Sequence, residues 1–418
     1  MNILFLTENF PPETNAAATR VFERAAYWVR WGHQVTVITC APNFPRGKLF
    51  EGYENRWSQV EEMAGIRVVR VKTFVTRNEG VVLRTVDFLS FLFTGTSAGV
   101  FEKQPDVVVA TSPQFFAAVA GWLVGAARSI PFIFELGDLW PASIVAVGAI
   151  HENPLLKWLE RFELFLYRRS ACVVALTPSF KENLAARGTP PDKIATVING
   201  VDMFRYAPRP RDETLSELWN LGDRFVVGYI GTHGMAHALR NVLDTADRLQ
   251  NEENLRFILA GAGAERSALM AEARNRRLDN VIFVPPQPKD NMPAVWSLCD
   301  VALVHLRNTA TFKEVIPSKI FEAMAMGLPI ILATPEGEAS RIVAENGAGI
   351  WVPAEDPDAL AQAVRRLMYD SETRRTLAAQ SLAAAPEYTR ENQARKMLAV
   401  LELAAAGRGS EVGVLVPT

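Results

Sequence analysis

The two halves of this 418-residue chain begin with the same order of expected elements, and this repeat limits the possible folds more than any other feature. Near the N-terminus, an apolar strand pattern at Ile3–Thr7 leads through a loop into an amphipathic helix pattern at Ala17–Trp31. The second half repeats this plan with a strand pattern at Phe225–Ile230, a glycine-bearing turn and a helix pattern at Ala236–Gln250. A strand, a helix and a further strand in this order form a βαβ unit, which requires a parallel sheet. We therefore expect an α/β fold with two Rossmann-like domains.

Composition and charge narrow the class of protein. The length allows two or three domains with cores of their own, and a formal net charge of −2 gives no bulk attraction to nucleic acid. Cys40, Cys172 and Cys299 are far apart in apolar surroundings, so we expect buried thiols and no disulfide framework or metal site. The chain starts without a secretory signal pattern, and its longest apolar run, Phe115–Ala127, is too short to span a membrane. These features predict a cytoplasmic protein.

The segment Glu314–Gly327, E-V-I-P-S-K-I-F-E-A-M-A-M-G, carries the most specific chemical pattern. Seven residues separate Glu314 from Glu322, and Lys319 lies between them. Because Pro317 suits the first turn of a helix, we expect Glu314 on the preceding loop and Lys319 and Glu322 on one helical face. A cation near a helix N-terminus favours phosphate, and a carboxylate one turn further accepts hydrogen bonds from sugar hydroxyls. The pattern predicts a site for a nucleotide sugar; the alternative is an ordinary surface ion pair.

Three further motifs accompany the P-S-K-I-F-E of this segment, which starts at Pro317: F-P-P-E from Phe10, G-H-Q-V-T-V from Gly32 and D-L-W-P from Asp138. Together they resemble the retaining glycosyltransferases of family 4, which have the GT-B fold, and within it the fucosaminyltransferase-like enzymes of bacterial O-antigen, capsule and exopolysaccharide synthesis. The resemblance extends from Met1 to about residue 403.

The resemblance implies a domain organisation. It implies an acceptor-binding domain at residues 1–203 and a nucleotide-sugar-binding domain at residues 204–385, facing each other across a cleft. A C-terminal helix at residues 386–406 would cross back to the first domain, and residues 407–418, which have no periodicity, are expected to form a flexible tail.

The resemblance also assigns roles to the E-x7-E residues. Glu314 would face the donor sugar, Glu322 would bind the ribose hydroxyls, and Lys319 would stabilise the leaving diphosphate. Ile320, between these residues, is assigned to the same nucleotide site.

Gly231, Gly234 and Gly263 follow two strand patterns of the second half. Glycines there let backbone N–H groups approach a diphosphate, although a plain tight turn is an equal alternative. The chain departs from the family pattern here, because His233 and His237 stand where most members carry an Arg and a Lys. Charge compensation should then depend on Lys319 and on backbone amides.

Asp138 follows an apolar strand pattern and precedes Trp140-Pro141. A carboxylate at the carboxyl end of a parallel strand can reach a ligand. The resemblance implies a similar position for Asp138, because many members of the family have a His or Asp in this region, near the reacting sugar. The alternative is that Asp138 caps a helix that begins near Pro141. Because no D-x-D motif or His/Asp cluster has ligand spacing, we expect no essential metal and no cofactor.

The sequence therefore predicts a retaining transfer of a hexose or an N-acetylhexosamine. The donor is expected to be UDP-linked, and the acceptor a polyprenyl-diphosphate-linked saccharide of a bacterial surface polysaccharide. Two stretches, Val81–Phe101 and Leu155–Arg169, suggest peripheral contact with the inner membrane, with ordinary packed helices as the alternative. Rival functions are a nucleotide-sugar epimerase on the same fold and a non-catalytic nucleotide-binding or scaffold subunit.

Overall fold

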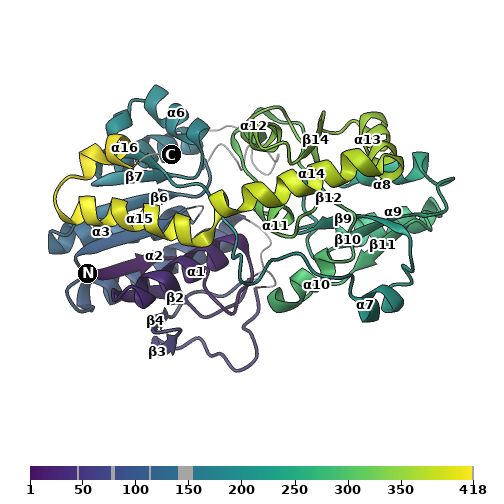
Figure 1. The fold of residues 1–418 in the computed structure, drawn as a ribbon. Coiled ribbons are helices and arrows are strands. Elements are labelled where there is room, and N and C mark those ends of the chain that lie inside the picture. The colour runs from purple at the N-terminus through teal and green to yellow at the C-terminus, as the bar shows by residue number, and fades with distance from the viewer. Residues whose placement is uncertain (45–46, 77–80, 113, 140–153, 417–418) are drawn as a thin grey trace. The chain divides into compact units, whose positions relative to one another are not determined.

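The computed structural model describes residues 1–44, 47–76, 81–112, 114–139 and 154–416 (Figure 1). The chain forms two compact units: unit 1 comprises residues 1–199 and 390–418, and unit 2 comprises residues 200–389. The first break lies a few residues before the expected boundary at 203, and the second follows the expected boundary at 385. Unit 1 is therefore built from two separate stretches of sequence.

Unit 1 contains an eight-stranded sheet with the strand order β3-β4-β2-β1-β5-β6-β7-β8. The strands pair in parallel except β3, which is antiparallel to β4. The strands are β1 (Asn2–Leu6), β2 (Gln34–Cys40), β3 (Ser58–Met63), β4 (Ile66–Val71), β5 (Val107–Thr111), β6 (Phe132–Leu136), β7 (Cys172–Ala175) and β8 (Ile194–Thr196).

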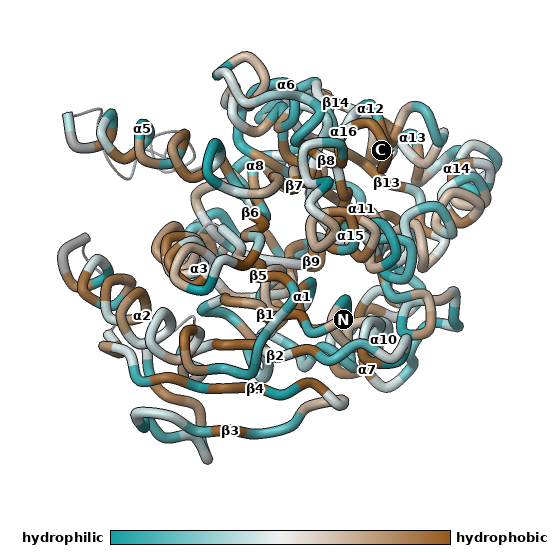
Figure 2. Tube along the Cα trace, turned by 90° about the vertical axis from the view of Figure 1, so that its left-hand side faces the viewer, coloured by the Kyte–Doolittle hydropathy of each residue, from teal (hydrophilic) through white to brown (hydrophobic). Residues whose placement is uncertain are grey.

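Helices cover both faces of this sheet. They are α1 (Ala16–Arg30), α2 (Val81–Phe101), α3 (Phe115–Arg128), α5 (Pro154–Arg169), α6 (Pro178–Ala186), α15 (Arg390–Ala405) and α16 (Val412–Leu415). Buried side chains of α1, α15 and α16 share one apolar cluster with one face of the strands. On the other face, Gly121 of α3 lies against Ala110 and Phe132, and Tyr167 of α5 packs edge-on against Phe134 at 4.9 Å. Thus α2, α3 and α5 lie on one side of the sheet, and α1, α15 and α16 lie on the other (Figure 2).

The C-terminal stretch completes unit 1. The Trp28 indole of α1 donates a hydrogen bond to the Ala394 carbonyl (2.9 Å), and Arg390 pairs with Glu23 at 2.8 Å. Residues after Gly407, expected to form a flexible tail, instead fold into a 3-10 turn and α16. The expectation was wrong because Val412 supplies a fully buried side chain to the core, a contact that local periodicity cannot reveal.

A buried ion pair lies in the same unit. Glu135 of β6 is fully buried and contacts Arg24 at 2.7 Å and Arg20 at 3.4 Å. Burial alone would raise the pKa of Glu135, but the two guanidinium groups outweigh it and lower the pKa to about 2. The carboxylate therefore stays charged at any physiological pH.

Unit 2 contains a six-stranded parallel sheet with the order β11-β10-β9-β12-β13-β14. Its strands are β9 (Phe225–Ile230), β10 (Leu255–Ala260), β11 (Val281–Val284), β12 (Val301–His305), β13 (Ile330–Ala333) and β14 (Gly349–Val352). Its helices are α7 (Glu213–Leu218), α8 (Arg240–Arg248), α9 (Arg266–Asn275), α10 (Met292–Trp296), α11 (Lys319–Ala325), α12 (Glu338–Glu345), α13 (Pro357–Tyr369) and α14 (Ser371–Ala384). The helix expected at residues 236–250 begins only at Arg240, because Ala238 has a left-handed φ of 44°. Two sheets, parallel except for β3, with flanking helices are the architecture predicted from the sequence.

Among the described residues, no helix is long and apolar enough to cross a membrane.

Candidate functional site

The E-x7-E segment lies in unit 2. Glu314 is the last residue of a 3-10 turn, Ala310–Glu314, and α11 begins at Lys319. Pro317 therefore precedes the helix, where its carbonyl accepts a hydrogen bond from the Ile320 N–H (3.1 Å). Lys319 and Glu322 lie one turn apart on α11, and Glu314 lies on the connection before it.

Lys319 is a buried cation. Its Nζ lies 3.8 Å from the centre of the Tyr229 ring, and no acceptor among the described residues takes a hydrogen bond from it. Burial lowers the pKa of Lys319 to about 7, although the nearby Glu322 acts in the opposite direction. A buried ammonium without an acceptor is costly unless a ligand supplies negative charge, so this group is a candidate anion-binding site.

Gly231 follows β9 directly and allows the approach of this lysine. Its φ is 150°, and a Cβ at this position would lie 2.8 Å from Lys319 Nζ. Gly263, after β10, packs on the same loop, because its Cβ would lie 2.2 Å from the His233 carbonyl oxygen. Gly234 is different: its Cβ would meet only ordinary contacts, beginning at 3.5 Å from Thr232. Sterically, this turn requires glycine at 231 and 263 but not at 234.

Three histidines lie close to Lys319. The rings of His233 and His237 each lie 6.0 Å from the ring of Tyr229, and the His305 Nε2 lies 2.8 Å from the Asn241 Nδ2. Burial, with the nearby Lys319 charge, lowers the pKa of His233 to about 4 and that of His237 to about 3, and it lowers the pKa of His305 to about 4. These imidazoles are neutral near pH 7, so His233 and His237 supply uncharged hydrogen-bonding groups to this loop and no cation.

Other residues of the motif differ in what they offer. The Trp296 indole of α10 donates a hydrogen bond to the Glu322 Oε2 (3.1 Å), which fixes this carboxylate at the surface of α11. Glu314 is half-buried. The side chain of Ile320 is fully buried in the unit and its N–H already donates to Pro317, so the structure does not bring Ile320 to the site.

Asp138 belongs to unit 1. It lies two residues after β6, on a turn where the Gly137 N–H donates to the Ser112 hydroxyl (2.9 Å). Asp138 itself is half-buried. The alternative role, capping a helix near Pro141, lies outside the described residues.

The sequence analysis did not identify Tyr229 and Trp296, which contact Lys319 and Glu322. Their positions at strand or helix ends were visible, but no spacing rule links them to α11. Among the described residues, no group of three or more His, Cys, Asp and Glu side chains could hold a metal ion.

Two family models match the chain. The model described as "Glycosyl transferase 4-like domain" matches residues 15–200, and the model "Glycosyl transferases group 1" matches residues 212–382. Together they account for both units. The chain belongs to the family 4 glycosyltransferases of the GT-B fold. The membership of family 4 and the GT-B fold inferred from the motifs are thereby confirmed.

Relatives and solved structures agree with this placement of the glycosyltransferase. The putative colanic acid biosynthesis glycosyl transferase WcaI of Escherichia coli is 23% identical, over 88% of this chain and 92% of the relative. A GDP-mannose-dependent alpha-mannosyltransferase of Mycobacterium tuberculosis is 25% identical, over 91% and 93%. The crystal structure of HepE from Anabaena in complex with UDP covers 96% of this chain and 100% of its own, with a TM-score of 0.73 and 18% identity. Sucrose-phosphate synthase from Thermosynechococcus elongatus covers 97% and 99%, with a TM-score of 0.77 and 17% identity.

Proposed function

We propose that this glycosyltransferase moves a hexose or an N-acetylhexosamine from a UDP-linked donor, with retention, to a lipid-linked saccharide of a bacterial surface polysaccharide. The observation that carries the donor site is the buried Lys319 ammonium, which has no hydrogen-bond acceptor among the described residues and lies beside Gly231. Support for the donor class comes from structural neighbours described as complexes with UDP and with UDP-glucose. Support for the acceptor class comes from relatives named for colanic acid biosynthesis.

Lys319 would neutralise the diphosphate as it leaves. In the transfer, the bond between sugar C1 and the phosphate oxygen breaks while a bond to the acceptor oxygen forms on the same face. Negative charge builds on the diphosphate, so a preorganised ammonium stabilises the transition state more than the ground state. The acceptor proton can pass to the leaving phosphate oxygen, which removes the need for a base in unit 2.

The two carboxylates of the motif would position the donor. Glu322, held by Trp296, would accept hydrogen bonds from the ribose hydroxyls, and Glu314 would orient the donor sugar. Asp138 of unit 1 would position the donor sugar or the acceptor. No step of this proposed transfer uses a metal or a cofactor.

A non-catalytic nucleotide-binding subunit is the second candidate, because this loop carries the neutral His233 and His237 in place of the Arg and Lys of most family members. It predicts nucleotide binding without turnover. A nucleotide-sugar epimerase on the same fold would instead convert the donor without any acceptor.

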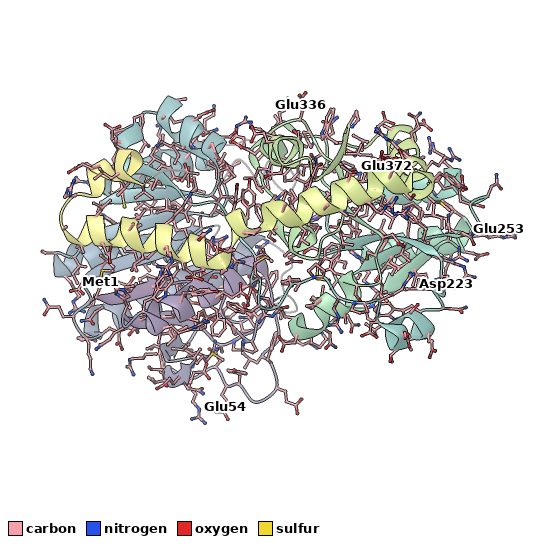
Figure 3. The ribbon with its side chains drawn as sticks, in the orientation of Figure 1. Met1, Glu54, Asp223, Glu253, Glu336 and Glu372 are labelled. Carbon is pink, nitrogen blue, oxygen red and sulfur yellow. The ribbon has the colours of Figure 1, made fainter. Side chains whose placement is uncertain are left out.

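Calorimetric titration with UDP, GDP and ADP, with and without EDTA, tests the donor site. We expect one nucleotide to bind without metal and its affinity to fall at least about ten-fold in Glu322→Ala, which loses charged hydrogen bonds. Glu253→Ala is the matched control: this exposed carboxylate precedes the amino end of β10, whereas Gly231 and Gly263 follow the carboxyl ends of β9 and β10 (Figure 3). Absence of binding to all three nucleotides would remove the proposed donor site, and binding without any sugar transfer to acceptors would favour the non-catalytic subunit.

A further inference from the structure

Helix α2 exposes an apolar stripe. Leu83, Val86, Phe93 and Phe101 are 48%, 41%, 73% and 86% exposed. Their spacing of 3, 7 and 8 residues places them on one side of a helix with 3.6 residues per turn. Arg84 and Asp87 are the only charged residues of the helix. The solvent-facing side of a helix normally carries charged residues, so this exposed apolar stripe is a candidate binding surface.

The inner side of α2 already has its own packing. Phe91 is fully buried, and Gly99 approaches Val124 of α3 so closely that a Cβ would lie 2.7 Å from Val124 Cγ2. The stripe is therefore not part of the buried core of unit 1.

Helix α5 adds an aromatic row with basic side chains beside it. Trp158, which is more than half exposed, stacks on Phe162 at 5.5 Å, and Phe162 stacks on Phe165 at 5.9 Å. The exposed cations of this helix are Lys157, Arg161, Arg168 and Arg169.

The acids of α5 do not cancel these charges. Glu160 pairs with Arg187 at 3.1 Å. Glu163 is buried, accepts a hydrogen bond from the Tyr167 hydroxyl (2.6 Å) and pairs with the same arginine at 3.2 Å. The surface of α5 that remains open to solvent is therefore positively charged.

The two helices belong to one face of unit 1. Between them lies α3, whose Trp122 and Phe115 pack edge-on against Phe165 and Phe162 of α5 at 5.3 and 5.7 Å. In Figure 2, α2 and α5 project on the same side of the sheet, with apolar turns along α2. We call this surface, formed by the stripe of α2 and the aromatic and basic side chains of α5, the α2–α5 face.

We propose that the α2–α5 face docks unit 1 on the surface of a lipid bilayer that contains anionic lipids. Apolar side chains of a helix lying in the interface enter the boundary of the acyl chains, tryptophan favours this boundary, and cations stay at anionic headgroups. The face offers these three groups. A second copy of the chain fits less well, because a two-fold contact would bring the basic side chains of α5 near each other. The proposal rests on the proposed function only in that a lipid-linked acceptor would lie in the same membrane.

Co-sedimentation with vesicles tests the docking without any assay of transfer. The probes are vesicles of phosphatidylethanolamine with phosphatidylglycerol, and vesicles of phosphatidylcholine alone. We expect binding to the first, weakened by salt, and little binding to the second. Phe93→Glu and Phe101→Glu each lower the affinity at least about ten-fold, because a carboxylate resists entry into the acyl boundary. The triple variant Lys157→Gln/Arg161→Gln/Arg168→Gln lowers it roughly five-fold per charge.

Val414→Glu is the matched control, because Val414 is an apolar residue, 67% exposed, on α16, which lies on the other side of the sheet. UDP titration of each variant reports the donor site of unit 2 separately, so loss of vesicle binding with intact nucleotide binding concerns the α2–α5 face alone. The proposal is overturned if wild-type protein ignores anionic vesicles, or if both phenylalanine variants bind them as the wild type does. It is also overturned if sedimentation velocity finds a dimer that Phe93→Glu dissolves, since the face would then be an interface between copies.

Discussion

Replacing Lys319 by methionine should stabilise unit 2 while it removes the anion-binding group. Methionine has a similar length and no charge, so it fills the space beside Tyr229 without a buried ammonium. The pKa of Lys319 is lowered from 10.5 to about 7, a shift of about 3.5 pH units. At 1.36 kcal/mol per unit, the buried charge costs on the order of 5 kcal/mol of folding free energy. The lost cation–π contact with Tyr229 reduces the gain by roughly 1–2 kcal/mol.

The sign of the pH dependence follows from the lowered pKa. The unfolded chain holds the Lys319 proton up to pH 10.5, whereas the folded chain loses it near pH 7. The cost is therefore complete below pH 7 and declines as the pH rises toward 10.5. The stabilisation by Lys319→Met should fall by about 2.7 kcal/mol between pH 6 and pH 9, because the unfolded chain binds one proton more than the folded chain over the two pH units above 7.

Thiol labelling in increasing urea measures this effect in unit 2. Cys299 is buried in unit 2, so mass spectrometry of its labelled peptide reports unfolding of that unit, and the other two cysteines report unit 1. Lys313→Met, at an exposed lysine on the preceding turn, is the control and should leave the urea midpoint unchanged. Destabilisation by Lys319→Met at both pH values, or a gain that does not change between pH 6 and pH 9, would refute the reasoning.

Three further outcomes are expected. At pH 8, binding of a UDP-sugar should take up close to one proton in the wild type and about none in Lys319→Arg. Binding heats measured in two buffers of different ionisation enthalpy give this number of protons, and equal uptake by the two proteins would exclude Lys319 as the proton acceptor. Gly231→Ala should abolish nucleotide binding in calorimetry, because its Cβ would lie 2.8 Å from Lys319 Nζ at a φ of 150°. Gly234→Ala should bind nucleotide as the wild type does, and loss of binding in this variant but not in Gly231→Ala would contradict the steric argument. Arg24→Met should lower the free energy of unfolding of unit 1 by roughly 3–5 kcal/mol in urea titrations, because the buried Glu135 carboxylate keeps only the longer contact with Arg20. The double variant Arg24→Met/Glu135→Leu should recover most of this stability, and no recovery would mean that lost packing, not the unpaired charge, causes the destabilisation.

Local sequence patterns predicted the parts of the site that depend on a single element. The order of carboxylate, lysine and carboxylate around Pro317 placed Lys319 and Glu322 one turn apart on α11, as the structure has them. The same reasoning could not pair Lys319 with Tyr229, which comes from β9, about ninety residues earlier in the chain. Such contacts depend on the sheet order, which spacing along one helix does not contain.

Two differences between the expected and the observed structure, at Ile320 and after Gly407, have the same physical origin. Ile320 shares the motif with its neighbours, but the rotation of α11 turns its side chain into the core. The segment after Gly407 has no periodicity of its own, yet Gly409 packs against the Ala171 carbonyl and Val412 is fully buried. In both cases the tertiary neighbours decide, and they were not visible in the local sequence.

The split composition of unit 1 also determines the order in which the chain can fold as it is made. Met397, Val400 and Leu401 of α15 are fully buried against α1, so the apolar side of α1 stays uncovered until these residues leave the ribosome. Unit 2 is continuous from 200 to 389 and is complete before that moment. The second unit synthesised can therefore be the first to reach its native core, while the nascent first unit waits with an open hydrophobic surface that chaperones can recognise.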